Sequence, residues 1–390
     1  MPFFNHIMAR SVKKSLGSLN NESSATTPAM NRKTRSLPGT ATKDSMDIYK
    51  LPDPQLASKY RTGVKMRKLL FMQSMLREQV DQLLGAIPPY SVEAYINAWR
   101  AYKIDKNLVR HSSAKKRVYA ARSVNRPDLS VAAWVISRTD IDSNSSVQLK
   151  ILRRLSSLHP FIIHTFELFC DQQNVYIFQE WAIGGNLIDY LARSSEPLEE
   201  RKAALWAKQI YRALDFLGDL AIAHRDISPN HLVVQPQSAT DTWLKLTGFS
   251  KSIIYWDVNS NDIQFCKCLP LERQKGDGAN FQPPEVYGNS ETEQFDPIQA
   301  DIWSYGASIL YMLAKQYPYN VVDPANDLDE EISHNIEAMS SRTEQCRNFV
   351  FALLRANAND RMPFDFIDTH PWFKANSTVM ILSSEVLYQF

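Results

Sequence analysis

The residues with the clearest chemical potential lie in the stretch HRDISPNHLVV, residues 224–234. The carboxylate of Asp226 could accept a proton from a hydroxyl group and so act as a general base. Such a base needs neighbours that hold the other reactant, commonly a lysine or oxygen ligands for a metal ion. The stretch contains Ser228 and His231 but no lysine. The stretch alone therefore leaves open whether the protein is an enzyme.

Composition and charge are those of an ordinary globular protein. The chain has 390 residues, 44% of them hydrophobic, with 44 basic and 42 acidic side chains. This length predicts one two-lobed domain with flanking tails. The net charge of +2 supplies no overall field that would attract a nucleic acid or an anionic membrane. We therefore expect no nucleic-acid partner.

The cysteines predict neither a disulfide framework nor a metal site. They are Cys170, Cys266, Cys268 and Cys346, and the one close pair, C-x-C, has no second pair to complete a zinc site. We expect free thiols in a reducing compartment. No uncharged apolar run approaches the roughly 20 residues of a membrane-spanning helix, so we expect no transmembrane segment.

Residues 1–54 are predicted to form a disordered basic tail rich in Ser and Thr. Phe4, Met8, Val12 and Leu16 recur every four residues within it, however, beside basic side chains. That pattern is also typical of a mitochondrial transit peptide or a membrane-surface anchor. We expect a cytoplasmic protein, with a mitochondrial location as the alternative.

Four regions follow this tail. Residues 55–105 have helical periodicity and predict a helical extension. Residues 106–182 are strand-rich, and RVYAARSV and LSVAAWVIS are joined by the turn signal NRPD, which predicts a hairpin. Helices dominate residues 183–373, interrupted by two short strands at HLVV and WLKLTGF. Residues 374–390 form a C-terminal tail.

Eight collinear motifs resemble those of a eukaryotic protein kinase domain. They are LHPFIIHTFELF, YIFQEWAIGGNLIDYL, HRDISPNHLVV, LKLTGFS, PPEV, DIWSYG, DRMPF and HPWF. The resemblance covers residues 100–373 and implies an α+β, bilobal protein-kinase-like fold. It assigns a small β-rich N-lobe to residues 106–182 and a larger helical C-lobe to residues 183–373. The terminal motif HPWF resembles that of the calmodulin-dependent-kinase-like group.

The groups that hold a nucleotide in that family are missing here. No glycine occurs from Ala86 to Ile183, so the glycine-rich loop over the phosphates is absent. Trp134 stands in VAAW where the family has the lysine of V-A-I-K, and an indole cannot neutralise a phosphate. Gln148 stands where the helix glutamate would hold that lysine. We expect Trp134 to fill the adenine or phosphate region.

The metal ligands are missing too. Family members hold Mg²⁺ with the aspartate of D-F-G and the asparagine of the catalytic loop. This sequence has Gly248 and His231 there. Glycine offers no ligand, and imidazole is a poor partner for a hard cation that prefers oxygen. Gly278 falls where the activation segment would carry a threonine.

Other family motifs survive, and each has a structural role. The resemblance implies that Asp301 hydrogen-bonds the backbone around the H-R-D turn. It also implies that Glu285 and Arg361 form an ion pair that ties the activation segment to the C-lobe. Core helices would keep Trp303, Trp372 and Phe373.

These observations predict a pseudokinase, in which Asp226 occupies the vestigial base position and neither ATP nor Mg²⁺ binds productively. Its expected role is that of a scaffold or allosteric regulator of a protein partner, such as an active kinase. One alternative is an atypical serine/threonine kinase that takes its phosphate-binding lysine from Lys115 or Lys116. Another is a nucleotide-binding switch that needs no metal. Arg225 could bind a phosphorylated serine of its own activation segment, among Ser250, Ser252 and Ser260. The oligomeric state is not predicted.

Overall fold

The computed structural model of this chain describes residues 101–112, 116–127, 129–140, 151–152, 159–238, 241–257, 262–274, 278–288, 290, 292–320 and 327–376. The predicted N-terminal tail, most of the predicted C-terminal tail and most of the helical extension lie outside these residues. Gln148, Lys115 and Ser260 and the side chain of Lys116 lie outside them too. Among the described residues, no helix is both long and apolar enough to cross a bilayer.

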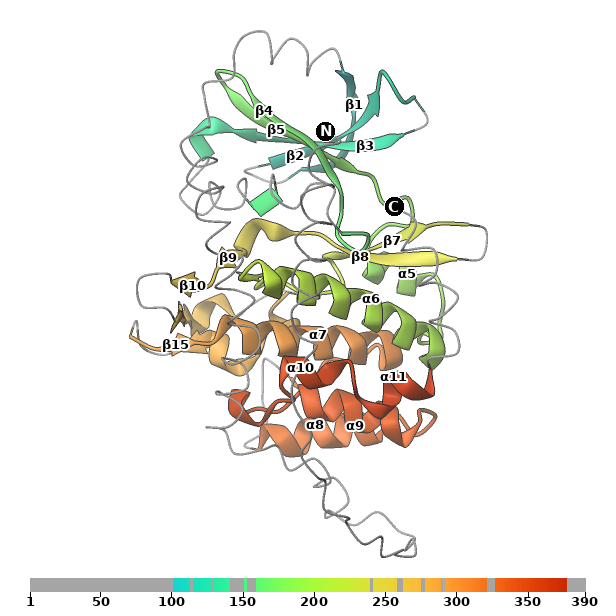
Figure 1. Cartoon of the computed structure of the whole chain (residues 1–390), viewed down its shortest axis with the longest axis vertical. Coiled ribbons are helices and arrows are strands. Elements are labelled where there is room, and N and C mark those ends of the chain that lie inside the picture. The colour runs from blue at the N-terminus through green and yellow to red at the C-terminus, as the bar shows by residue number, and fades with distance from the viewer. Residues whose placement is uncertain are drawn as a thin grey trace, which may run out of the picture. The chain divides into compact units, whose positions relative to one another are not determined.

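Five antiparallel strands form the N-lobe sheet, in the order β1-β2-β3-β5-β4 (Figure 1). They are β1 (Tyr102–Ser112), β2 (Lys116–Ser123), β3 (Ser130–Ser137), β4 (Thr165–Cys170) and β5 (Asn174–Glu180). The hairpin predicted from NRPD is confirmed as β2 and β3. Strand β1 begins within the predicted helical extension, which therefore ends before residue 102, because pairing with β2 overrides the helical pattern.

Alternation along β3 gives the sheet two apolar faces. Val131 and Ala133 belong to a small cluster on one face, with Phe178 of β5. Trp134 and Ile136 pack on the other face, against the main core that continues into the C-lobe. The sheet is thus joined to the helices through a shared apolar core.

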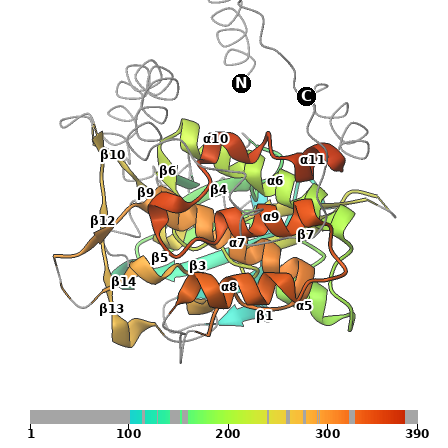
Figure 2. The ribbon, with the colours of Figure 1, turned by 90° about the horizontal axis from the view of Figure 1, so that it is seen from below.

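The C-lobe is built around two long helices, α6 (Glu200–Asp219) and α7 (Pro297–Ala314). Most residues of α7 are buried, which is why its apolar residues are nearly continuous. Helix α7 contacts α6 and α9, and α9 contacts α8 (Figure 2). A Cβ at Gly306 of α7 would lie 2.8 Å from Cβ of Leu353, so glycine permits this close crossing with α9. The other helices are α5 (Leu187–Ala192), α8 (Leu328–Glu337), α9 (Glu344–Leu353), α10 (Phe364–Ile367) and α11 (Pro371–Ala375).

Short strands carry the loops that form the site. The two strands predicted at HLVV and WLKLTGF are confirmed as the hairpin β7 (Leu232–Pro236) and β8 (Thr242–Leu246), which lies on α6. Strand β6 (Ile222–Ala223) pairs with β9 (Ile253–Ile254) and brings the segment after Gly248 back beside the H-R-D turn.

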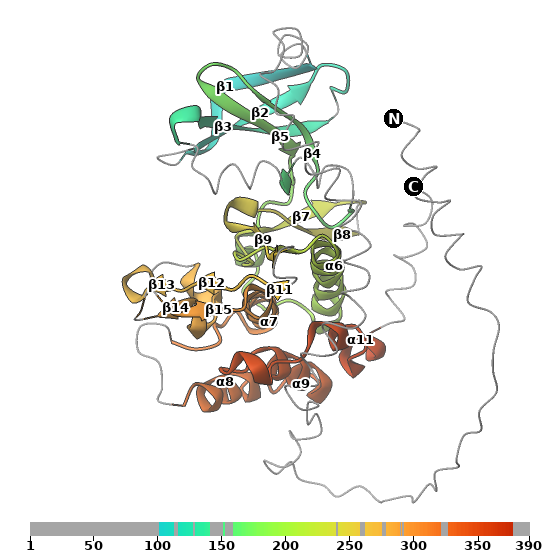
Figure 3. The same ribbon diagram turned by 60° about the vertical axis from the view of Figure 1, so that its left-hand side comes forward.

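The activation segment and the residues after it contain two-residue strands beside α7 (Figure 3). They are β10 (Trp256–Asp257), β11 (Asp262–Ile263), β12 (Cys266–Lys267), β13 (Leu269–Pro270), β14 (Tyr287–Gly288) and β15 (Gln294–Phe295). Strand β12 pairs with β15, and β13 pairs with β14. Short 3₁₀ helices lie among and around them: η3 (Phe249–Lys251), η4 (Leu271–Arg273), η5 (Ala279–Phe281) and η6 (Pro284–Val286).

Candidate functional site

The H-R-D turn is held by a buried carboxylate, as predicted. Asp301 of α7 accepts hydrogen bonds from the backbone N–H groups of His224 at 2.6 Å and Arg225 at 2.7 Å. Arg225 has φ +63°, a left-handed conformation that a non-glycine residue adopts only when its surroundings enforce it. Burial raises the pKa of Asp301 to about 7, against the lowering effect of the two N–H groups. Asp301 therefore stabilises a strained turn.

His224 is fully buried in this turn and is neutral. Its Nδ1 accepts the N–H of Asp226 at 3.2 Å, so its Nε2 carries the proton and donates to the carbonyl oxygen of Thr247 at 2.9 Å. Burial lowers the pKa of His224 to about 4. The ring packs edge-on against Phe249, at 4.9 Å between centroids. The histidine thus connects the turn to the start of the activation segment.

Asp226, the vestigial base position, already has a cationic partner. Lys251 Nζ donates to Asp226 Oδ1 at 2.8 Å. The Asp226 side chain is 9% exposed and that of Lys251 is 56% exposed. Ser228, which replaces the family's lysine, is buried. Lys251, at the end of η3, therefore places a positive charge beside Asp226.

Sequence reasoning missed Lys251. The available signal was its position, three residues after Gly248 in the segment that pairs beside the H-R-D turn. In the family pattern the lysine stands at the position of Ser228, so the motif gives no reason to expect one at position 251.

His231 and Gly248, which stand at the family's two metal-ligand positions, pack directly against each other. A Cβ at Gly248 would lie 2.5 Å from Cγ of His231 and closer still to Cδ2. Gly248 also has φ +87°, which glycine adopts without strain. The His231 Nδ1–H donates to the carbonyl oxygen of Asp226 at 2.7 Å and fixes the ring there. With this ring in place, an aspartate cannot occupy position 248 without displacing it.

His224 and His231 are neighbours in the site, and each ring already donates to a backbone carbonyl oxygen. The ring centroids of His224 and His231 are 6.3 Å apart. Within the part of the chain that the structure describes, no three His, Cys, Asp or Glu side chains are grouped so as to hold a metal ion. Cys266, Cys268 and Cys346 are free thiols, and burial raises the pKa of each.

Trp134 lies on the sheet face that packs on the main core. It pairs across the sheet with Val118 of β2 and with Ile177 of β5. The indole is partly buried and contacts the core cluster. Its occupation of a nucleotide region stays a prediction.

A buried ion pair connects the end of β5 with β8. Lys245 Nζ donates to both carboxylate oxygens of Glu180, at 2.8 and 2.7 Å. Beside it, Gln179, at the position that gates the back of the family's nucleotide pocket, donates from Nε2 to Thr165 Oγ1 at 3.0 Å. Sequence reasoning missed the Lys245–Glu180 pair, whose two residues are far apart in the chain.

The predicted anchor of the activation segment is confirmed. Arg361 donates from Nη1 and Nη2 to the two carboxylate oxygens of Glu285, at 2.5 and 2.8 Å. Its side chain is 0% exposed, also bonds to the carbonyl oxygen of Gln299, and lies over the ring of Trp303. Trp303, Trp372 and Phe373 are buried in the core, as predicted.

The serines considered as partners for Arg225 differ in accessibility. Ser252 is buried and donates to the carbonyl oxygen of His224 at 3.2 Å, whereas Ser250 is half-buried. The Arg225 guanidinium lies over the ring of Phe295 at 5.7 Å. Gly278, at the threonine position, is exposed, and a Cβ there would meet no atom within 4 Å. Steric crowding therefore does not explain the glycine.

The chain matches known protein kinases. The family described as "Protein kinase domain" matches residues 114–373. The human "SNF-related serine/threonine-protein kinase" is 26% identical over 275 residues, 70% of this chain and 33% of that protein. The "CBL-interacting protein kinase 20" of Oryza sativa subsp. japonica is 24% identical over 293 residues, 73% of this chain and 60% of that protein. The chain spans less than two thirds of the length of either relative.

Proposed function

Because this chain belongs to the protein kinase domain family, we propose that it does not transfer phosphate by the family's route. It acts instead as a scaffold or allosteric regulator of a signalling partner. The proposal concerns the site of Asp226, His231 and Gly248 and the fold that surrounds it.

The observation that carries the proposal is the packing of His231 against Gly248. Phosphoryl transfer depends on metal ions and fixed charges that position and neutralise the phosphates. If a metal-coordinating side chain were merely missing, water or another side chain could coordinate the metal in its place. Here an imidazole ring occupies the space into which a carboxylate at position 248 would extend. We therefore propose that Mg²⁺ and ATP do not bind productively.

The partner is proposed to be a protein, such as an active kinase. Residues that stabilise the fold are in place, among them Asp301 and the Glu285–Arg361 pair. A folded domain without working chemistry can still present surfaces to another protein. The cytoplasm is the proposed location; accumulation of the tagged full chain, but not of a form lacking residues 1–43, in mitochondria would contradict it.

A second candidate is an atypical serine/threonine kinase. The observation that favours it is the Lys251–Asp226 contact, because Lys251 restores beside the base position one positive charge that Ser228 cannot supply. The human relative is also named as a serine/threonine-protein kinase. This candidate needs a metal site or a way to work without one.

A thermal-shift titration with ATP, with and without Mg²⁺ or Mn²⁺, tests the proposal. A ligand that binds only the native state raises the unfolding midpoint. We expect no shift at millimolar nucleotide. A metal-dependent shift would favour the kinase, and a metal-independent shift would indicate a nucleotide-binding switch. A nucleotide-binding protein kinase measured in parallel serves as the positive control.

A further inference from the structure

Tyr190, in the last turn of α5, lies between two cationic side chains. Lys202 of α6 donates from Nζ to the Tyr190 hydroxyl oxygen at 2.9 Å. The same ammonium lies over the Tyr190 ring at 5.2 Å and over the Trp206 ring at 4.9 Å from the centroids. The guanidinium of Arg193 also lies over the Tyr190 ring, at 5.8 Å. Two positive charges therefore contact one phenol.

Neither cation has a carboxylate partner within the described part of the chain. The Lys202 ammonium has three N–H donors, and its one hydrogen bond there goes to a neutral hydroxyl. Asp189 is the acid next to Tyr190 in the chain, but consecutive helical residues do not face each other. The cluster therefore carries positive charge that an anion at the Tyr190 hydroxyl would neutralise.

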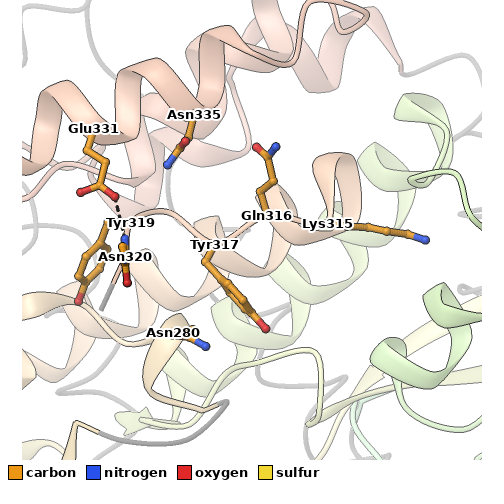
Figure 4. A pocket seen from close by; sticks show the side chains of 8 residues that line it. All are labelled: Asn280, Lys315, Gln316, Tyr317, Tyr319, Asn320, Glu331 and Asn335. Atoms are coloured by element: carbon orange, nitrogen blue, oxygen red, sulfur yellow. Dashed lines mark hydrogen bonds between the residues drawn. The ribbon is translucent and has the colours of Figure 1, made fainter. Parts of the chain in front are cut away.

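Arg193 is held beside the ring with unused donors. Its Nη2 donates to the carbonyl oxygen of Gly184 at 3.0 Å, in the segment that links β5 to α5. Among the described residues, its Nε and Nη1 have no hydrogen-bond partner. Lys315 fixes the chain beyond it: this side chain points away from the other residues that line the pocket in Figure 4, and it donates to the carbonyl oxygens of Ser194 and Ser195. Arg193 is thus preorganised for an anion.

We propose that Tyr190 is a site of tyrosine phosphorylation and that Lys202 and Arg193 hold the phosphate. A tyrosine kinase transfers the γ-phosphoryl group of ATP: the Tyr190 hydroxyl oxygen bonds to the phosphorus, the bond to the ADP leaving group breaks, and the hydroxyl proton is released. A phosphate on this oxygen starts within reach of Lys202. Its oxygens then accept charge-assisted hydrogen bonds from both cations. This site goes beyond the proposed function and does not depend on it.

Opening one helical turn exposes Tyr190 to a kinase. The side chain is half-buried, and residues 192–196 are exposed. Helix α5 has six residues. The hydrogen bonds that end it run from the N–H groups of Arg193 and Ser194 to the carbonyl oxygens of Tyr190 and Leu191, and both are 3.3 Å long. Such an exposed helix end opens at a small free-energy cost, so modification does not require unfolding of the core.

The test of the phosphate site uses full chain with phosphotyrosine installed at position 190 by genetic code expansion, so that every molecule carries it. Thermal unfolding compares modified with unmodified protein in the wild-type background, in Lys202→Gln/Arg193→Gln and in the control Arg201→Gln. Arg201 is an exposed cation of α6 that precedes Lys202 and does not share its face. The shift is taken within each background, so the effect of a substitution alone cancels.

We expect the phosphate to raise the unfolding midpoint by about 2–4 °C in the wild type and in the control. In the double variant the midpoint should stay unchanged or fall, because the dipole of α5 opposes a negative charge in its last turn. A midpoint that does not rise in the wild type would overturn the proposal, and so would an equal rise in the double variant.

Access to Tyr190 is measured with a broad-specificity tyrosine kinase and ATP. Mass spectrometry of the full wild-type chain locates the phosphate, and Tyr190→Phe controls for the assignment. We expect phosphate at Tyr190, and a chain left unmodified there would contradict the proposal. The same incubation without the added kinase detects transfer by the chain itself, which would reject the proposed function and not this site.

Discussion

Two regions of the C-lobe have diverged from the kinase pattern to different degrees. Around α7, Asp301 and the Glu285–Arg361 pair keep the family's residues, and each makes the contact expected of it. At the turn between β6 and β7, Ser228 replaces the family's lysine and His231 replaces its asparagine. After β8, Gly248 replaces the aspartate of D-F-G. The residues kept bond to this chain's own backbone or buried charges. The residues replaced are those that would meet only a nucleotide or a metal.

Asp226 lies at the boundary between these regions. Its backbone N–H bonds to His224, and its carbonyl oxygen accepts from His231. Its carboxylate, which would be the base, contacts Lys251. Under the proposed function, contacts needed for folding have constrained the sequence, whereas contacts to a ligand have not. Substitutions in the two regions should therefore differ in their effect on stability.

The largest expected effect is at the buried anchor. Glu285→Ala removes the partner of Arg361, whose guanidinium then stays buried without its carboxylate. Removal of one member of a buried pair costs about 3–5 kcal/mol. Urea unfolding measures this loss, and Glu272→Ala, at an exposed glutamate of η4, should stay close to the wild type. A loss of less than about 1 kcal/mol for Glu285→Ala would remove the distinction between the two regions.

The next effect tests the crowding at position 248. Gly248→Asp should cost about 2–3 kcal/mol, from the contact with His231 and from the left-handed backbone. His231→Asn in the same chain should recover about 1 kcal/mol, because it removes the ring but not the backbone strain. Denaturant unfolding of the wild type, the two single variants and the double variant gives the coupling free energy between positions 231 and 248. Equal cost of Gly248→Asp in both backgrounds would mean that the ring does not occupy that space.

The pH dependence of stability tests a buried histidine of the scaffold. Burial lowers the pKa of His370, the N-cap of α11, from 6.5 to about 4. The imidazole of His370 therefore binds a proton more tightly in the unfolded chain than in the folded one. The stabilisation of the folded state by neutral His370 is complete above pH 6.5 and is lost as the pH falls toward 4. Asp301, with a raised pKa, works in the opposite direction, so the wild-type slope alone is ambiguous.

His370→Asn keeps an N-cap acceptor without the titration. We expect its free energy of unfolding to fall less steeply over this pH range, by up to about 1.4 kcal/mol per pH unit. Parallel pH profiles for the variant and the wild type would show that His370 titrates normally.

The smallest effect is expected at the replaced site. Lys251 is largely exposed, and the loss of such an ion pair costs at most about 1 kcal/mol. Lys251→Ala should therefore unfold close to the wild type, as should Lys267→Ala at an exposed lysine of β12. A loss well above 2 kcal/mol would place Lys251 among the residues that the fold requires.

Periodicity and motif order predicted most of the fold. The hairpin β2–β3, the helices α6 and α7, Asp301 and the Glu285–Arg361 pair all follow from local patterns or the spacing of family motifs. The end of the helical extension at residue 105 was predicted wrongly, because the apolar spacing of residues 102–105 is helical and only pairing with β2 makes them a strand.

The contents of the site could not be predicted in the same way. The ring of His231 beside Gly248, and Lys251 beside Asp226, depend on how separate loops converge after β6 pairs with β9. The Lys245–Glu180 pair likewise joins residues that are distant in the chain. A single sequence shows which groups are missing from known positions. It does not show which side chains fill the space.

Transfer of labelled phosphate from ATP tests the central claim most directly. Purified full chain, its Asp226→Asn variant and an active kinase are compared on a generic protein substrate with Mg²⁺ and with Mn²⁺. We predict no transfer above the blank for the wild type and the same result for Asp226→Asn. Transfer by the wild type that Asp226→Asn abolishes would show that Asp226 is a working base, and it would contradict this account.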